Sequence, residues 1–205
     1  MSFLDLFGFE PDEASPDEPS EVHEPMPWLA PPESELGVSV PLSLIVARSE
    51  KGVVAVPHAT VYSNGVQFEL LAQARGLRRG QANRMFHEQH GGLDDEEGLP
   101  GGFLRIGIEL PGGARVSNLM GRRMFHRRQS RPDGPVLMMH GGGGGQASDN
   151  LVSLRPGYWL WPLPEPGTLR LSCEWPIAEI ALHTVEIDAT RIHEAAQQVS
   201  LLWPA

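Results

Sequence analysis

The stretch VVAVPHATVYSNGVQFELLA, residues 53–72, decides the fold class. Residues 53–56 and 59–62 are strand-like, and Ser63-Asn64-Gly65 predicts a tight hairpin turn with positive backbone angles. Apolar side chains then alternate again along the chain, at Val66, Phe68, Leu70 and Ala72. Two alternating runs on either side of a tight turn indicate an antiparallel β-hairpin.

The same pattern continues outward from this hairpin in both directions. Before it, VSVPLSLIVAR places Val38, Val40, Leu42, Leu44 and Val46 on one face. After it, further strands are predicted at 104–110, 114–119, 136–139, 151–154, 158–163, 168–175 and 180–187. Turn residues separate these segments, which predicts an all-β fold, an antiparallel two-sheet sandwich of immunoglobulin-like or jelly-roll-like type.

Only the end of the chain has a helical pattern. Asp188 is a suitable N-cap, and Pro204 ends the run. The apolar residues at helix spacing between them are Ile192, Ala195, Ala196, Val199 and Leu202. The sequence predicts one C-terminal α-helix that covers an edge or an open end of the sandwich.

The acidity of the chain is concentrated in residues 1–37. This segment holds ten Asp and Glu residues and no Lys or Arg, although the net charge of the whole chain is -10. From Glu10 to Gly37 it is also rich in Pro and Ser, a composition that buries too little apolar surface to offset the cost of ordering. We therefore predict a disordered arm over residues 1–37 and one neutral β-sandwich domain over residues 38–205.

The number of cysteines and the length of the apolar runs indicate in which cellular compartment the protein is expected. Cys173 is the single cysteine, so no intramolecular disulfide can form, and it shares strand parity with Leu169, Leu171 and Trp175. We expect it to face inward. No apolar run approaches the ~20 residues that a membrane span needs, and the N-terminus lacks a basic flank and a cleavage site. We expect a cytoplasmic protein without a membrane span.

The run VLMMHGGGGGQ, Val136–Gln146, resembles the oxyanion-hole segment of lipases and esterases. That family also needs a G-x-S-x-G nucleophile elbow, which the sequence lacks, and strands that alternate with helices. The run also lacks the Lys-Ser/Thr that completes a phosphate-binding loop. We interpret it as a strand over residues 136–139 followed by a flexible glycine loop.

Two further resemblances concern the C-terminal third. GTLRLSCEW, Gly167–Trp175, resembles the second strand of an immunoglobulin variable domain, without the second Cys of that family. The stretch from Tyr158 to Trp203, with WPLPEPG and CEWP, resembles uncharacterised proteins of actinobacteria. The first resemblance implies a sandwich, and the second implies no activity.

A histidine pair and nearby acids form a candidate metal site. His87 and His90 flank Glu88-Gln89, and four acidic residues follow at 94–97. A zinc pair on a helix more often uses i and i+4 spacing, and the sequence identifies no third ligand. We interpret the segment as a solvated loop and expect no metal or cofactor.

Arginines gather in the middle of the chain. Residues 71–131 carry eleven Arg against six acids, with a dense group formed by Arg122, Arg123, Arg127, Arg128 and Arg131. Such a group could contact phosphates. The acidic net charge and the lack of a nucleic-acid-binding motif argue against nucleic acid, and pairing with the acidic arm or with a protein partner explains the group as well.

An apolar cluster lies at the tip of the arm, in MSFLDLFGF. Leu4-Asp5-Leu6-Phe7 resembles the short peptides with which bacterial replication and repair proteins bind the sliding clamp, although Phe3 stands where Gln is usual. Alternatively, Phe3, Leu4, Leu6 and Phe7 fold back onto the body or form a self-association patch.

These observations predict a non-enzymatic protein-interaction or adaptor module. It would use the docking peptide on its acidic tether and the loops of the sandwich to bind a protein partner or a second copy. The alternative is an enzyme or small-molecule binder with a site built from loops 76–102 and 121–150, where His87, His90, His126 and His140 lie.

Overall fold

The structure, a computed structural model, describes residues 25–90, 99–119, 131–148 and 150–203. Within these ranges the chain is mostly β and its strands pair antiparallel. The regular helices there are α2 (Arg79–His90), the 3-10 turn η2 (Pro176–Ala178) and α4 (Ala189–Ala196). The prediction of an antiparallel all-β fold is therefore confirmed at this level.

The strands of the described residues form three sheets. The larger sheet has the order β2 (Val38–Arg48), β3 (Gly52–Tyr62), β4 (Gly65–Arg75), β8 (Leu151–Trp161) and β7 (Val136–Ala147). The four-stranded sheet has the order β10 (Ile180–Asp188), β9 (Thr168–Trp175), β5 (Arg105–Glu109) and β6 (Arg115–Ser117). A two-stranded sheet joins β1 (Glu35–Leu36) to β11 (Ser200–Leu201).

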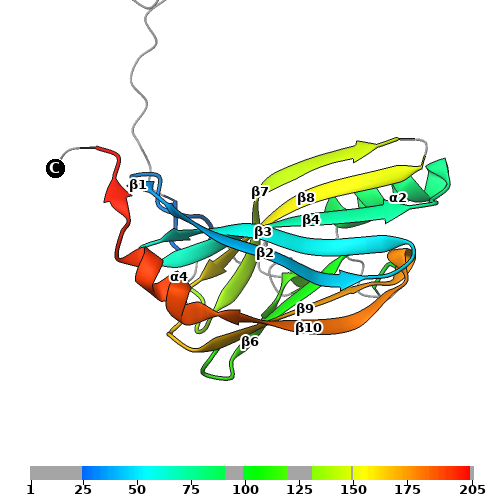
Figure 1. Cartoon of the computed structure of the whole chain (residues 1–205). Helices are drawn as coiled ribbons and strands as arrows, with labels where there is room; N and C mark the ends of the chain where they lie inside the picture. The colour runs from blue at the N-terminus through cyan, green and yellow to red at the C-terminus, as the bar shows by residue number, and fades with distance from the viewer. Residues whose placement is uncertain (1–24, 91–98, 120–130, 149, 204–205) are drawn as a thin grey trace, which may run out of the picture.

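The two larger sheets lie in two layers around one hydrophobic core (Figure 1). Phe68 and Leu160 of the five-stranded sheet belong to the same buried cluster as Leu171 and Trp175 of the four-stranded sheet. At one end of the layers α4 contacts β2, β3 and β9, and α2 lies at the opposite end (Figure 1). The core therefore fixes both sheets, and their outer faces are left for other contacts.

The hairpin at residues 53–72 forms, but its turn differs from the prediction. Tyr62 pairs with Gly65, so the turn residues are Ser63 and Asn64, and none of Ser63, Asn64 and Gly65 has a positive φ. The carboxylate of Glu35 accepts hydrogen bonds from the backbone N–H and the hydroxyl of Ser63. Glycine is needed at position 65 for space, because a Cβ there would lie 2.5 Å from the ring of Trp159.

Two strands of the structure were each predicted as two separate segments. The predicted strands 53–56 and 59–62 form β3, and 151–154 and 158–163 form β8, which ends at Trp161. Pro57 lies between Ala55 and His58, where the pairing with β4 shifts register. Pro156 pairs with Gly142, where β7 is irregular. Strands tolerate proline at such bulges.

Residues 25–36, which the sequence assigned to a disordered arm, belong to the described fold. Trp28 and Leu29 pack against a hydrophobic cluster, and β1 pairs with β11. The few apolar residues of this segment meet an apolar surface that only the tertiary structure creates, so the described contacts begin before Val38. Residues 1–24, with the remainder of the predicted arm, lie outside the described residues.

Both helices differ from the prediction. Helix α2 was not expected, because the apolar residues of its sequence show no clear helical period; among its described side chains, Ala82 and Met85 are buried. Asp188 caps α4 as predicted, since its carboxylate accepts a hydrogen bond of 2.9 Å from the N–H of Thr190. The helix ends at Ala196, however, because the chain beyond it pairs with β1 and does not continue toward Leu202.

Candidate interaction site

The glycine run is part of a strand and not a loop. Strand β7 passes through it and pairs with β8 at one edge of the five-stranded sheet. The pairing shifts twice within the run, first between Met139 and Gly142 and then between Gly142 and Gly144. Gly141 has a φ of +62°, and a Cβ on Gly157 would lie 2.3 Å from the carbonyl oxygen of His140. Glycine at these positions permits the bulges and the close approach of two backbones.

This setting differs from the one that the lipase-like resemblance implies. The segment runs along an antiparallel edge, whereas the lipase family places it in a fold of strands alternating with helices. The carbonyl of His140 accepts a hydrogen bond of 3.3 Å from the amide of Gln67, and burial lowers the pKa of the imidazole. Burial thus favours the neutral form of the His140 imidazole, and the backbone of this residue belongs to a β-bulge.

The candidate metal segment is divided between described and undescribed residues. His87 and His90 lie on α2, but their side chains, like residues 94–97, are outside the described part of the chain. The carboxylate of Glu88 accepts a hydrogen bond of 2.8 Å from the N–H of Gly102, which attaches α2 to the segment that precedes β5. No group of three metal-ligating side chains occurs among the described residues.

Other predicted site residues cannot be placed. Phe3, Leu4, Leu6, Phe7, Arg122, Arg123, Arg127, Arg128 and His126 all lie outside the described residues. Of the loops 76–102 and 121–150, α2 and β7 take large parts, so these segments are more regular than predicted. In the part of the chain that is described, no helix has the length and apolar character of a membrane span.

The single cysteine lies in the core, as predicted. Cys173 is 1% exposed in β9, and it belongs to the buried cluster with Leu169, Leu171 and Trp175. Burial raises the pKa of its thiol to about 11. At neutral pH the side chain is therefore a protonated thiol enclosed in the protein, which is the opposite of a reactive cysteine.

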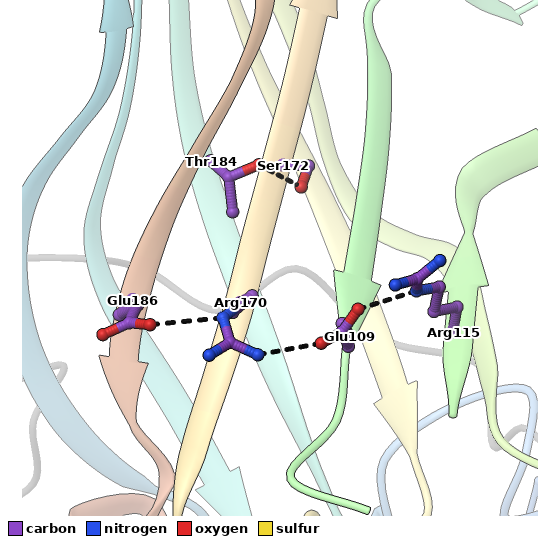
Figure 2. Close-up of polar contacts among 6 residues, drawn as sticks. All are labelled: Glu109, Arg115, Arg170, Ser172, Thr184 and Glu186. Atoms are coloured by element: carbon purple, nitrogen blue, oxygen red, sulfur yellow. Dashed lines mark hydrogen bonds and ion pairs between the residues drawn. The ribbon is translucent and has the colours of Figure 1, made fainter. Parts of the chain in front are cut away.

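The outer face of the four-stranded sheet carries a row of alternating charges (Figure 2). Arg170 forms ion pairs with Glu186 at 3.2 Å and with Glu109 at 2.9 Å, and Glu109 pairs with Arg115 at 2.7 Å. The pKa of Glu109 is lowered, mainly by the hydrogen bond from Arg115 and next by the one from Arg170. The pKa of Arg170 is raised, mainly by its hydrogen bond to Glu109 and next by the one to Glu186. The two positive and two negative charges of this row therefore neutralise each other.

A second row on this face is small and polar. Ser172 and Thr184 share a hydrogen bond of 2.8 Å between their hydroxyls (Figure 2). On the other side of β9, Gly107 of β5 pairs with Ser172. Arg105 and Glu174 form a further ion pair next to this row. Exposed polar rows of this kind are typical of the solvent side of an antiparallel sheet, so we assign this face to solvent.

One part of the outer face of the five-stranded sheet, around Trp159, is apolar and covered. Val136, Met138 and Trp159 form a second buried cluster, and Trp28, Leu29, Tyr62 and Trp161 pack against it. The covering segment, residues 25–34, is called the strap here. The indole N–H of Trp159 donates a hydrogen bond of 2.9 Å to the carbonyl of Pro27 in the strap. Burial, and secondarily the charge of Glu35, raise the pKa of the Tyr62 phenol.

A further apolar surface is exposed where the strap ends. Leu36 in β1 and Leu201, Leu202 and Trp203 in and after β11 are between 49% and 73% exposed. The pairing of β1 with β11 and a hydrogen bond of 2.8 Å from the N–H of Leu202 to the carbonyl of Ser34 hold these residues together. We call these four residues the apolar ribbon; β1 and β11 lie side by side in Figure 1.

Sequence reasoning did not identify either surface. The stretch Tyr158-Trp159-Leu160-Trp161 was a signal for the covered one, because consecutive large apolar residues predict a strand buried on both faces. The ribbon had no comparable signal, since Leu36 comes close to the residues in and after β11 only through the pairing of β1 with β11.

Comparison of the chain with protein-family models, curated proteins and solved structures finds no match. The surfaces described above therefore carry the functional interpretation.

Proposed function

We propose that this protein is a non-enzymatic interaction module and that the apolar ribbon is its contact surface for a partner protein. The observation that carries the proposal is the exposure of Leu36, Leu201, Leu202 and Trp203 on and just after one narrow two-stranded sheet, where Leu36 and Leu201 lie on opposite faces. Grouped exposed apolar residues mark protein contacts, whereas scattered ones are common on any surface. Trp is also enriched among residues that dominate binding energy at interfaces.

Charge suggests the chemistry of the partner. The segment before β2 carries ten acidic residues and no Lys or Arg. A partner with an apolar groove and Lys or Arg around its rim would complement both the ribbon and this segment. Its association rate would decrease with added salt, because long-range attraction between charged surfaces is screened.

Three earlier expectations belong to the same proposal. The apolar tip with Phe3, Leu4, Leu6 and Phe7 would be a second contact on the acidic segment. The two sheets around one core would form a β-sandwich. The single buried cysteine suits a reducing compartment, which supports a cytoplasmic location.

Site-specific photo-cross-linking tests the proposal. A photoreactive amino acid replaces Trp203 in one variant and Leu182 in the control, because Leu182 is 72% exposed but lies on β10, away from the ribbon. In the native host we expect a defined adduct from position 203 only, and its loss when Leu201→Ser is added. An adduct of twice the chain mass would identify a second copy as the partner.

Equal labelling from positions 203 and 182, or none from 203, would contradict the proposal. Sedimentation of the purified chain with and without Leu201→Ser gives the oligomeric state independently, so self-association through the ribbon is measured without reference to the host.

A further inference from the structure

The strap and the surface beneath it have the composition of a peptide and its binding site. The strap contains Pro25-Met26-Pro27-Trp28-Leu29, and Pro31-Pro32 follow. The surface consists of rings and apolar side chains from three strands of the five-stranded sheet: Tyr62 on β3, Trp159 and Trp161 on β8, and Val136 and Met138 on β7. Proline-rich segments are commonly bound by aromatic surfaces of this kind.

The contacts between strap and sheet are ones that a separate peptide can also make. Trp159 donates from its indole N–H to the carbonyl of Pro27. The ring of Trp28 meets the ring of Trp161 edge to face, with centroids 6.2 Å apart. The guanidinium of Arg131 lies 5.5 Å from the centroid of the Trp161 ring. One directional hydrogen bond and ring contacts define a position for a Pro-Trp pair without any strand pairing to the sheet.

Residues of the sheet itself hold the ring of Trp159 in place. Trp159 and Tyr62 meet edge to face, with centroids 5.8 Å apart. Gly65 leaves room for the Trp159 ring, since a Cβ there would lie 2.5 Å from two of its carbons. The position of Trp159 is therefore set by the sheet, and the indole N–H points outward to whatever occupies the surface.

The strap fills this surface imperfectly. The indole N–H of Trp28 is buried and has no hydrogen-bond partner within the described part of the chain. A buried donor without an acceptor weakens an interaction, so a peptide that supplied an acceptor beside this Trp would bind the surface better than the strap does. The strap keeps its place through its attachment to β1, which gives it a high effective concentration.

We propose that the apolar surface under the strap, on the outer face of the five-stranded sheet, is a peptide-recognition site for proline- and tryptophan-containing segments. The strap occupies this site in cis, and a segment of the same chemistry in a partner protein replaces the strap. This site is separate from the apolar ribbon, and neither proposal depends on the other.

A peptide added in trans tests the site. The full chain carrying Trp28→Ala and Leu29→Ala keeps the surface but weakens its cis occupant, and the probe is a synthetic peptide with the sequence of residues 24–34, EPMPWLAPPES. Titration calorimetry should show at least about tenfold tighter binding to this variant than to the wild type, because the strap no longer competes. A peptide in which Ala replaces its Trp should bind neither protein.

Two further variants serve as controls for the peptide titration. Trp161→Ala added to the variant should abolish binding, because it removes the ring that the peptide's Trp contacts. If Trp28→Ala with Leu29→Ala does not fold, Trp28→Leu replaces it, since Leu retains apolar contact but not the ring. No binding to a variant that unfolds as cooperatively as the wild type, or equal binding to variant and wild type, would overturn the inference. Cross-linking at Trp203 is unaffected by either outcome.

Discussion

At the scale of single residues, two glycines act by leaving space. Gly65 accommodates the ring of Trp159, and Gly157 accommodates the carbonyl of His140, although neither has a positive φ. In both cases the neighbour belongs to another strand of the same sheet. The requirement for glycine therefore comes from tertiary packing and not from local turn geometry.

Replacing Gly157 tests this conclusion. In Gly157→Ala the new Cβ would lie 2.3 Å from the His140 carbonyl oxygen, which is backbone and cannot move without disturbing β7. We expect the free energy of unfolding to fall by roughly 1–3 kcal/mol, the usual cost of overpacking. Urea denaturation measures the change.

Gly144→Ala, in the neighbouring strand β7, is the matched control. A Cβ at position 144 has no neighbour within 4 Å, and the φ of Gly144 is not positive. Its effect should be about 1 kcal/mol or less, of either sign. Equal losses in the two variants would show that the close approach of Gly157 to His140 has no energetic consequence.

The buried thiol makes a second prediction at this scale. Cys173 should react with thiol reagents at the rate of unfolding and not faster, because it is 1% exposed. Its folded pKa of about 11 lies above the ordinary 9.0, so its contribution to stability is complete below pH 9.0 and is lost as pH rises toward 11. Wild type should therefore lose more stability over this interval than Cys173→Ala, as followed by urea denaturation at each pH. Parallel curves would contradict the assignment.

At the scale of elements, the side chain of Asn118 continues the hydrogen bonding of strand β6 beyond the last residue of that strand. Strand β6 ends at Ser117, opposite Gly107. The amide of Asn118 then accepts from the N–H of Ile106 at 3.0 Å and donates to the carbonyl of Leu104 at 2.8 Å. It also reaches the hydroxyl of Tyr158, on β8 of the other sheet, at 3.2 Å. Asn118 thus completes the edge of β5 and connects the two layers.

Removing this amide should be costly. Asn118→Ala leaves the N–H of Ile106 buried without its acceptor, and we expect a loss of roughly 1–3 kcal/mol in the free energy of unfolding. Ser117→Ala, one residue earlier on the partly exposed face, should change stability by about 0.5 kcal/mol or less. Chemical denaturation of the two variants side by side provides the measurement, and similar values would argue against the bridging role.

At the scale of the whole molecule, the described residues form two hydrophobic clusters of unequal size. The main core lies between the sheets, whereas the smaller cluster lies outside the five-stranded sheet under the strap. Trp159 belongs to the smaller cluster, and its neighbours Tyr158 and Leu160 belong to the main core. Because few buried contacts hold the strap, we expect it to open without unfolding of the sheets.

Native-state hydrogen exchange tests this separation. The amide of Leu29, which donates to Met26 within the strap, should exchange through local opening, and the amides of β4 through global unfolding. Trp159→Phe removes the donor to Pro27 and should speed exchange at Leu29 by about fivefold, equivalent to ~1 kcal/mol. Exchange in β4 should change less. Identical acceleration at both places would mean that strap and core unfold together.

The sequence by itself determined the class of the fold and the orientation of its main strands. Alternating residues such as Val40 and Val46 in β2 face the core as predicted, and Cys173 does so in β9. The N-cap at Asp188 was also predicted correctly. These features depend on residues close in the chain, where periodicity and capping chemistry act directly.

Only the tertiary structure decided the roles of the glycine run, α2 and the strap. The run became a bulged edge strand because β8 lies beside it, and the strap became ordered because Trp159 and Trp161 form a surface for Trp28. The apolar ribbon exists because β1 meets β11, whose residues are far apart in the chain. Each depends on a neighbour brought close by folding, and no local pattern of residues encodes such a neighbour.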